Sequence, residues 1–286
     1  MKVLITGAGG QLGIELVATC TEAGDDVIAT DRQTLDVSSR DEVLGVVTTI
    51  QPDVVVHTAA MTAVDACEDD PAAAYRSNAL AARHVAEACR LAGSHLVGVS
   101  TDYVFDGTKH GAYVEFDAPN PQSVYGRSKL AGEIEVFRGC PGAAVVRTSW
   151  VSGFHGSNVV KTILRLVGSG DQPLAFVDDQ VGCPTFTSDL APLLRRIAVS
   201  RVPGVLHATN ARAVSWYELA REVLGAAGLD PARVQPIRTA DLVPPRPAPR
   251  PANSALDGLA LRGAGFDPLP DFSGPLARLV KELKDV

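Results

Sequence analysis

The sequence predicts an α/β protein: a Rossmann-like, doubly wound parallel sheet followed by a smaller C-terminal α/β substrate domain. Short β-branched apolar runs alternate with helix-length segments through the first half, which is typical of strands buried on both faces. A glycine-rich turn comes directly after the first run. After Trp150 this rhythm changes, which indicates a second structural unit.

The first half is expected to contain five strands separated by four helices. Because parallel neighbours are joined by right-handed crossovers, the helices should cover both faces of the sheet. The expected strands are residues 3–6, 27–30, 54–57, 96–100 and 144–147, and the expected helices are residues 12–23, 41–50, 71–92 and 122–138.

The second half is expected to mix helices with short strands. Ser215 and Glu218 form a capping box at the start of one helix, and Gly274-Pro275 marks the start of the last. The proline-rich residues 244–251 cannot be helical, and the interleaved arginines favour a rigid extended loop over a ligand rather than a linker. The expected helices are residues 159–168, 188–199, 215–227 and 276–285, with extended segments at 175–177 and 205–208.

The strand at residues 205–208 is a candidate to return to the main sheet, so the two units should interleave. We therefore expect one unit at residues 1–150 with a returning segment near 180–212, and a second, interleaved unit at residues 151–286.

The composition is that of an ordinary globular protein, with 286 residues, 46% hydrophobic and 21% charged. The net charge of −7 gives no indication of nucleic acid or an anionic membrane surface as a partner. No apolar stretch is long enough to span a bilayer, and the first residues lack a signal-peptide pattern, so a cytoplasmic protein is expected. Five scattered cysteines predict reduced thiols rather than a disulfide framework or a zinc site.

Three glycines, Gly7, Gly10 and Gly13, follow the first strand and open the first helix. They permit a tight turn and close approach of a pyrophosphate to the helix N-terminus, so they predict a dinucleotide site. Asp31 ends the second strand, where a carboxylate binds the adenosine ribose and favours NADH, whereas Arg32 favours the 2′-phosphate of NADPH. The choice between NADPH and NADH stays open. Further expected cofactor contacts are Gln11, Leu12, Asp36, Val37, Ala59, Ala60, Tyr125 and Lys129.

Tyr125 and Lys129 stand four residues apart on an expected helix, which brings both side chains to one face. A free phenol has a pKa of about 10, and a neighbouring ammonium lowers it, which produces a usable general acid or base. Ser100-Thr101 closes the fourth strand at the carboxyl edge of the sheet, where such proteins bind ligands. A hydroxyl there is placed to bind a substrate carbonyl while Tyr125 protonates it.

These motifs resemble the extended short-chain dehydrogenase/reductase superfamily and, within it, the dTDP-4-dehydrorhamnose reductase family. The matching stretches run from residue 3 to about residue 254. They are Gly7-x-x-Gly10-x-x-Gly13, residues 59–65, residues 100–107, Tyr125-x-x-x-Lys129, residues 147–150, Asp179-Gln180-x-Gly182-x-Pro184-Thr185 and Arg250-Pro251-x-Asn253-Ser254.

The resemblance implies NAD(P)H-dependent reduction of the C4 ketone of a dTDP-4-keto-6-deoxyhexose, with dTDP-4-dehydrorhamnose converted to dTDP-rhamnose. Thr101 would hold the carbonyl oxygen, Tyr125 would protonate it, and Lys129 would lower the Tyr125 pKa and bind the nicotinamide ribose. It also implies that residues 1–150 form a dinucleotide-binding domain and residues 151–286 a nucleotide-sugar-binding domain. The implied substrate contacts are Thr62, Val64, Thr101, Asp102, Val104, Phe105, Trp150, Asn158, Lys161, Arg250 and Asn253.

Two alternatives share the same motifs: a sibling dTDP-4-keto sugar reductase of secondary metabolism, including a dihydrostreptose-type one, and a non-catalytic regulatory subunit. Some family members form magnesium-linked dimers, and Glu15 matches one acidic position. Ser188 stands beside Asp189 where an acidic pair would be expected, which removes one oxygen ligand and disfavours a magnesium site. No residue is assigned to a metal, and a homodimer is left open.

Overall fold

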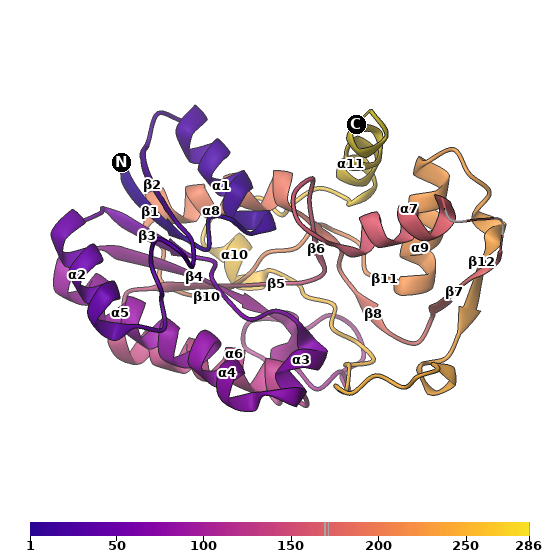
Figure 1. Ribbon diagram of the computed structural model, residues 1–286, viewed down its shortest axis with the longest axis horizontal. Coiled ribbons are helices and arrows are strands. Elements are labelled where there is room, and N and C mark those ends of the chain that lie inside the picture. The colour runs from indigo at the N-terminus through magenta and orange to yellow at the C-terminus, as the bar shows by residue number, and fades with distance from the viewer. Residues whose placement is uncertain (169, 171, 286) are drawn as a thin grey trace.

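A six-stranded parallel sheet lies at the centre of the larger lobe in the computed structural model, which describes residues 1–168, 170 and 172–285 (Figure 1). The strand order is β10-β5-β4-β3-β1-β2 and every neighbouring pair is parallel. The strands are β1 (Lys2–Thr6), β2 (Asp26–Thr30), β3 (Val54–His57), β4 (His95–Thr101), β5 (Ala144–Thr148) and β10 (Gly204–His207). The five expected strands of the first half are confirmed.

Helices cover both faces of this sheet, as a doubly wound fold requires (Figure 1). On one face α1 (Gln11–Glu22), α8 (Thr187–Ser200) and α10 (Leu259–Gly263) share a core with β1, β3, β4 and β5. On the other face α2 (Arg40–Ile50), α5 (Ala81–Ala92) and α6 (Val124–Gly139) form a second core. Both cores consist mainly of valine, leucine and alanine side chains.

The helix expected at residues 71–92 is interrupted. It consists of α4 (Pro71–Tyr75), a π-helical turn (Arg76–Leu80) and α5, and a short helix, α3 (Val64–Asp69), precedes it. Asn78 lies in the π turn, where its amide accepts from the Met61 backbone N–H at 2.8 Å and donates to the Ser128 hydroxyl at 2.9 Å. The wider turn places the Asn78 carbonyl so close to α6 that a Cβ on Gly132 would lie 2.2 Å away.

The smaller lobe has its own core, to which Ile163, Val223, Phe272 and Leu276 contribute. β7 (Leu174–Val177) and β12 (Val234–Ile237) form a parallel pair beside the helices (Figure 1). The helices are α7 (Val159–Gly168), α9 (Trp216–Ala226) and α11 (Ser273–Lys284), with single 3-10 turns at Pro231–Arg233 and Thr239–Asp241. The expected capping box of Ser215 and Glu218 is confirmed at the start of α9.

Short strand pairs connect the lobes. β6 (Val151–Ser152) pairs with β9 (Thr185–Phe186), and β8 (Val181–Gly182) pairs with β11 (Val214–Ser215). After β9 the chain rejoins the larger lobe through α8 and β10, and β10 pairs with β5 at the edge of the main sheet. The division into residues 1–150 and 151–286 stays a prediction.

All five cysteines are free and buried, as expected. Within the described part of the chain, the helices are too short or too polar for any of them to cross a bilayer.

Candidate active site

The expected catalytic residues and most of the expected cofactor residues meet in a cavity of about 410 Å³ at the carboxyl ends of β1, β3, β4 and β5. Open α/β sheets bind ligands at this edge. The lining residues are Gly7, Gly10, Gln11, Leu12, Gly13, Thr58, Ala60, Thr62, Val64, Val99, Ser100, Thr101, Asp102, Tyr103, Tyr125, Lys129, Thr148, Ser149, Trp150, Val151 and Trp216.

The glycine turn forms one end of this cavity, and two of its glycines cannot be replaced without a clash. Gly7 has a φ of +73°, and a Cβ there would lie 2.7 Å from the Ala59 backbone nitrogen. A Cβ on Gly13 would lie 2.1 Å from the Gly7 carbonyl oxygen. The turn therefore presents bare backbone and the N-terminus of α1 to the cavity, an arrangement that fits the pyrophosphate of a dinucleotide.

Asp31 lies beside this turn, because the Ala8 N–H donates to the carbonyl of Thr30 at the end of β2. Its carboxylate accepts hydrogen bonds from the backbone N–H groups of Gln33 and Thr34 and from the Thr34 hydroxyl, which lower its pKa. Asp31 is therefore charged at neutral pH.

Four of the expected cofactor residues belong to the segment after β2. Asp31, Arg32, Asp36 and Val37 are not among the described residues that line the cavity. Neither is Ala59, whose backbone nitrogen lies against Gly7. Asp36 instead accepts hydrogen bonds from the backbone N–H and hydroxyl of Ser38, which lower its pKa.

Thr101 and Tyr125 face the cavity from two regular elements. Thr101 is the last residue of β4, and its hydroxyl donates to Asp102 Oδ1 at 2.9 Å. Tyr125 lies in the first turn of α6, a helix capped by Ser123. Burial raises the pKa of Tyr125 well above its usual value, although the hydrogen bond with Thr101 opposes this shift. Tyr125 is therefore a neutral phenol at physiological pH, suited to donate a proton.

Lys129 does not bring the pKa of Tyr125 below its usual value in this structure, which corrects the expectation from the sequence. Its ammonium donates to the Val99 carbonyl of β4 at 2.7 Å, because the long side chain reaches across to the strand. Burial lowers the pKa of Lys129 to about 8, with the charge of Glu133 acting in the opposite direction. The desolvation of the phenol outweighs any effect of the ammonium on Tyr125.

A buried ion pair behind Lys129 was missed in the sequence. Arg147 of β5 binds Glu133 of α6 through two hydrogen bonds of 2.9 and 2.6 Å, and the two side chains are only 4% and 5% exposed. The Ser100 hydroxyl donates to the same carboxylate at 2.5 Å. Ser100 is thereby bound to the ion pair, whereas the Thr101 hydroxyl donates to Asp102. An arginine inside an apolar strand was the signal that could have revealed this network.

Three of the residues implied for the sugar, Thr62, Val64 and Trp150, line the cavity. Val104 and Phe105 do not, which corrects their expected role. They are 0% and 1% exposed and pack with Tyr113 and Leu256 in a separate core cluster. The 3-10 turn at Asp102–Val104 directs the chain away from the strand end and into the interior.

The side chains expected near the nucleotide-sugar bind other parts of the protein. Asn158 donates to the Gln11 side chain at 2.9 Å, Lys161 donates to the Phe154 and Gly156 carbonyls, and Asn253 donates to the Lys109 and Gly111 carbonyls.

Arg250 is bound by Asp65 of α3 through two contacts of 2.7 and 2.8 Å. The proline-rich residues 244–251 form no helix, as expected, and are held there by Arg250, Arg246 and the Ala248 N–H, all on Asp65.

Trp216 lines the cavity and was not identified in the sequence. It follows the capping residue Ser215 and stacks on Trp150. Nothing in the local pattern distinguishes it from a core aromatic residue, because the contact joins segments 66 positions apart in the chain (216 − 150).

The residues considered for magnesium lie apart from the main cavity. Glu15 and Ser188 line a small pocket near α11, while Asp189 accepts from Asn210 and pairs with Arg278. The described residues contain no group of three or more His, Cys, Asp or Glu side chains that could hold a metal ion.

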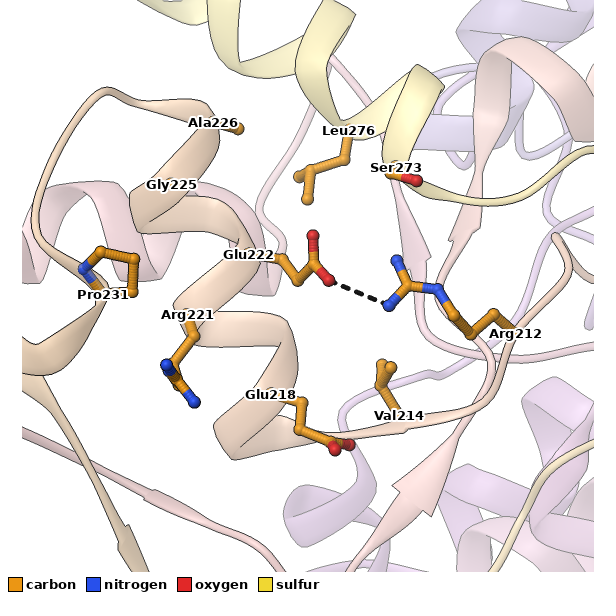
Figure 2. Close-up of a pocket in the computed structure, with 10 residues that line it drawn as sticks. All are labelled: Arg212, Val214, Glu218, Arg221, Glu222, Gly225, Ala226, Pro231, Ser273 and Leu276. Carbon is orange, nitrogen blue, oxygen red and sulfur yellow. Dashed lines mark hydrogen bonds and ion pairs between the residues drawn. The ribbon is translucent and has the colours of Figure 1, made fainter.

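A further cavity of about 530 Å³ lies between α9 and α11 (Figure 2). Arg212 points across it and pairs with Glu222 at 2.9 Å. Among the described residues, none that lines this cavity was expected to act on a ligand. Its charged groups compensate one another, so we place the candidate site at the sheet edge.

The chain matches the family model of the RmlD substrate binding domain over residues 1–285. It is 43% identical over 282 residues to a dTDP-4-dehydrorhamnose reductase of Mycobacterium tuberculosis, covering 96% of this chain and 91% of that one. It is 45% identical over 280 residues to a probable dTDP-4,6-dihydroxy-2-methyloxan-3-one 4-ketoreductase of Streptomyces antibioticus, covering 96% and 93%. A crystal structure of dTDP-4-dehydrorhamnose reductase from Bacillus anthracis in complex with NADP superposes with a TM-score of 0.94 at 37% identity, covering 99% of this chain and 100% of that one.

Proposed function

The chain belongs to the RmlD substrate binding domain family, and on that premise we propose that it reduces the C4 ketone of a dTDP-4-keto-6-deoxyhexose. The names of the relatives point to dTDP-4-dehydrorhamnose as the substrate, with dTDP-rhamnose as the product. The observation that carries the proposal is the meeting of Thr101, Tyr125 and the glycine turn in one cavity.

The glycine turn and the N-terminus of α1 support a nicotinamide dinucleotide as the cofactor, and the relative solved with NADP agrees. When bound, this group supplies the hydride that adds to C4. Asp31 and Arg32 at the end of β2 would set the preference between NADH and NADPH, and Lys129 would contact the nicotinamide ribose.

The chain's own residues handle the oxygen and its proton. On binding of the substrate, the Thr101 hydroxyl would turn from Asp102 to the carbonyl oxygen and hold it by a hydrogen bond, which polarises the C4–O4 bond and fixes its orientation. As charge develops on O4, Tyr125 donates its phenolic proton to that oxygen, and the product is a neutral alcohol. The ammonium of Lys129, four residues away on α6, would stabilise the phenolate until solvent returns a proton.

The ion pair between Glu133 and Arg147 supports this arrangement from behind. It ties α6 to β5, and through Ser100 it also ties α6 to β4. The two elements that carry the reacting side chains, β4 and α6, are therefore joined to each other and to β5 by buried, charge-assisted hydrogen bonds.

A second candidate is a sibling 4-ketoreductase of secondary metabolism, which the Streptomyces antibioticus relative favours at 45% identity. Both candidates require the same hydride and proton transfer and differ in the sugar they accept. A non-catalytic regulatory subunit is disfavoured by the presence of Thr101, Tyr125 and Lys129 together at the cavity.

The test is to incubate the purified protein with dTDP-4-keto-6-deoxyhexoses and NADH or NADPH, and to identify the product by NMR. The expected result is oxidation of the cofactor with formation of a dTDP-6-deoxyhexose whose C4 carries a hydroxyl. The stereochemistry at C4 separates the two reductases. If none of the ketosugars is reduced with either cofactor, the proposal is wrong.

We further propose that the protein acts in the cytoplasm, where its five buried thiols would stay reduced. A homodimer is compatible with the fold, and light scattering in solution with and without magnesium would test both the dimer and any dependence on that ion.

A further inference from the structure

Trp150 adopts a backbone conformation that bulky residues avoid. Its φ is +47°, in the left-handed region, and it lies between the end of β5 and the short strand β6. Such a conformation persists only where the surrounding structure fixes it, and it is concentrated at functional sites. The half-buried indole lines the same cavity as Thr101 and Tyr125. What fixes Trp150 therefore also fixes one wall of the proposed sugar site.

The first group that fixes Trp150 is the indole of Trp216. The two rings are stacked, with centroids 3.4 Å apart and an interplanar angle of 7°. Trp216 is the first residue of α9, and the helix start beneath it is held by the capping box, in which Ser215 and Glu218 exchange hydrogen bonds of 2.7 and 3.1 Å.

The second group is Gly182. A Cβ at this position would lie 2.5 Å from Cε2 and 2.7 Å from Nε1 of Trp150, so a glycine is needed for the indole to occupy its place. Gly182 is not in the left-handed region, so the side chain of Trp150, rather than the local backbone, is what requires glycine here.

Gly182 and Trp216 belong to one structural unit. β8 pairs with β11 so that Gly182 lies opposite Val214 and Val181 lies opposite Ser215, the residue before Trp216. The ribbon formed by β8 and β11 thus supplies both contacts to the indole of Trp150. It also joins them to the core of the smaller lobe, against which both tryptophans pack.

We propose that Trp216 is a positioning residue: together with Gly182 it holds Trp150 in its left-handed conformation, so that the indole sets the placement of the sugar ring relative to Thr101 and Tyr125. The inference deepens the proposed function and rests on it, because the sugar nucleotide is taken as the ligand of this cavity. According to this proposal, the pair of strands β8 and β11 aligns the ketone by holding Gly182 and Trp216 against Trp150.

The stacking itself has a direct optical test, because the chain contains only two tryptophans. Two stacked indoles couple, so the wild-type protein should show an exciton couplet in circular dichroism. Trp150→Phe and Trp216→Phe should each remove the couplet, since each leaves a single indole, and Gly182→Ala should change its shape. A wild-type spectrum equal to the sum of the two single-indole variants would overturn the proposal.

Steady-state kinetics separate positioning from simple contact. For a dTDP-4-keto-6-deoxyhexose that the wild type reduces, Trp216→Ala should lower kcat by about 10- to 100-fold, because a displaced wall misaligns the ketone. Trp216→Phe should recover most of kcat, since a phenyl ring can still stack. A rise in KM with kcat unchanged would show a contact that binds ground state and transition state alike, and would overturn the positioning role.

Gly182→Ala is the sharpest variant, because it changes neither tryptophan and none of the proposed catalytic side chains. It should lower kcat as Trp216→Ala does, because the added Cβ displaces the indole of Trp150. Its matched control is Gly142→Ala, where a Cβ meets nothing within 4 Å and kcat should stay at the wild-type value. NADPH binding, measured by the fluorescence of the nicotinamide, should be unchanged in all variants and shows that each has folded.

The outcomes distinguish this inference from the proposed function. If the wild type reduces a ketosugar while Gly182→Ala and Trp216→Ala match Gly142→Ala, the positioning role is wrong and the proposed function stands. If the wild type reduces no dTDP-4-keto-6-deoxyhexose, the function fails and the positioning role fails with it.

Discussion

The two walls of the cavity are built by different means. One wall, here called the regular wall, carries Thr101, Tyr125 and Lys129. It consists of the end of β4 and the first turns of α6, both long and regular elements. The opposite wall, with Trp150 and Trp216, is assembled from two-residue strands and a left-handed backbone position. The reacting groups are thus fixed by backbone hydrogen bonding, whereas the proposed sugar wall depends on side-chain contacts between distant segments.

Tyr125→Phe should give the largest effect and tests the regular wall directly. The variant lacks the proton donor, so kcat for ketone reduction should fall by about 10²- to 10⁴-fold. Because the hydroxyl does not build the glycine turn, NADPH should still bind, as fluorescence titration would show. Turnover at the wild-type rate would remove Tyr125 from the mechanism.

Arg147→Met tests how the regular wall is held together. The substitution leaves Glu133 buried and unpaired, which should lower the free energy of unfolding by about 3–5 kcal/mol in denaturant titrations. Arg138→Met provides the matched control, because Arg138 pairs with Glu135 while being 71% exposed, and its loss should cost at most about 1 kcal/mol. The double variant Arg147→Met with Glu133→Leu should recover much of the loss. If Arg147→Met and Arg138→Met lowered the free energy of unfolding by the same amount, the buried pair would have no special role.

The pH dependence of kcat/KM tests whether Lys129 works as a cation. Its pKa is lowered to about 8 by burial, so the ammonium is present below that pH and is lost above it. Reduction should therefore slow above about pH 8, approaching about tenfold per pH unit. Because Glu133 raises the pKa of Lys129, Glu133→Gln should move this decline to lower pH. A profile that stays flat well above pH 8 would contradict a role for the charge.

The smallest expected effect concerns the cofactor end. Asp31 is exposed and charged, so it would repel the 2′-phosphate of NADPH. Asp31→Ser should therefore raise kcat/KM for NADPH relative to NADH by about two- to fivefold, the size typical of an interaction between exposed charges. Arg32→Ala is the paired variant and should shift the ratio toward NADH. If Asp31→Ser and Arg32→Ala shifted this ratio in the same direction, the two side chains would not set the preference between NADH and NADPH.

The sequence predicted the regular wall and little of the other. Strands β1 to β5 and helix α6 follow from apolar runs and helical spacing, so Thr101, Tyr125 and Lys129 were placed correctly relative to the glycine turn. The direction of the Tyr125 pKa was wrong because burial, which depends on the folded surroundings, outweighs the neighbouring ammonium.

The remaining failures have two physical causes, a local turn and contacts between remote segments. Val104 and Phe105 turn inward because a 3-10 turn follows β4, and local spacing does not report such a turn. The stacking of Trp216 on Trp150 and the binding of Arg250 by Asp65 join remote parts of the chain. Contacts of this kind leave no periodic signal that a single sequence could display.

The return of the chain to β10 limits how this protein could be rebuilt. Because β10 and α8 complete the larger lobe only after the chain has visited the smaller one, no single cut of the backbone separates two self-sufficient modules. Replacing the C-terminal half as one continuous stretch with that of a relative would also replace β10, an edge strand of the main sheet. A change of sugar preference is therefore more accessible through exchange of the short connecting segments, such as residues 149–154, 180–186 and 211–217, than through shuffling of whole domains.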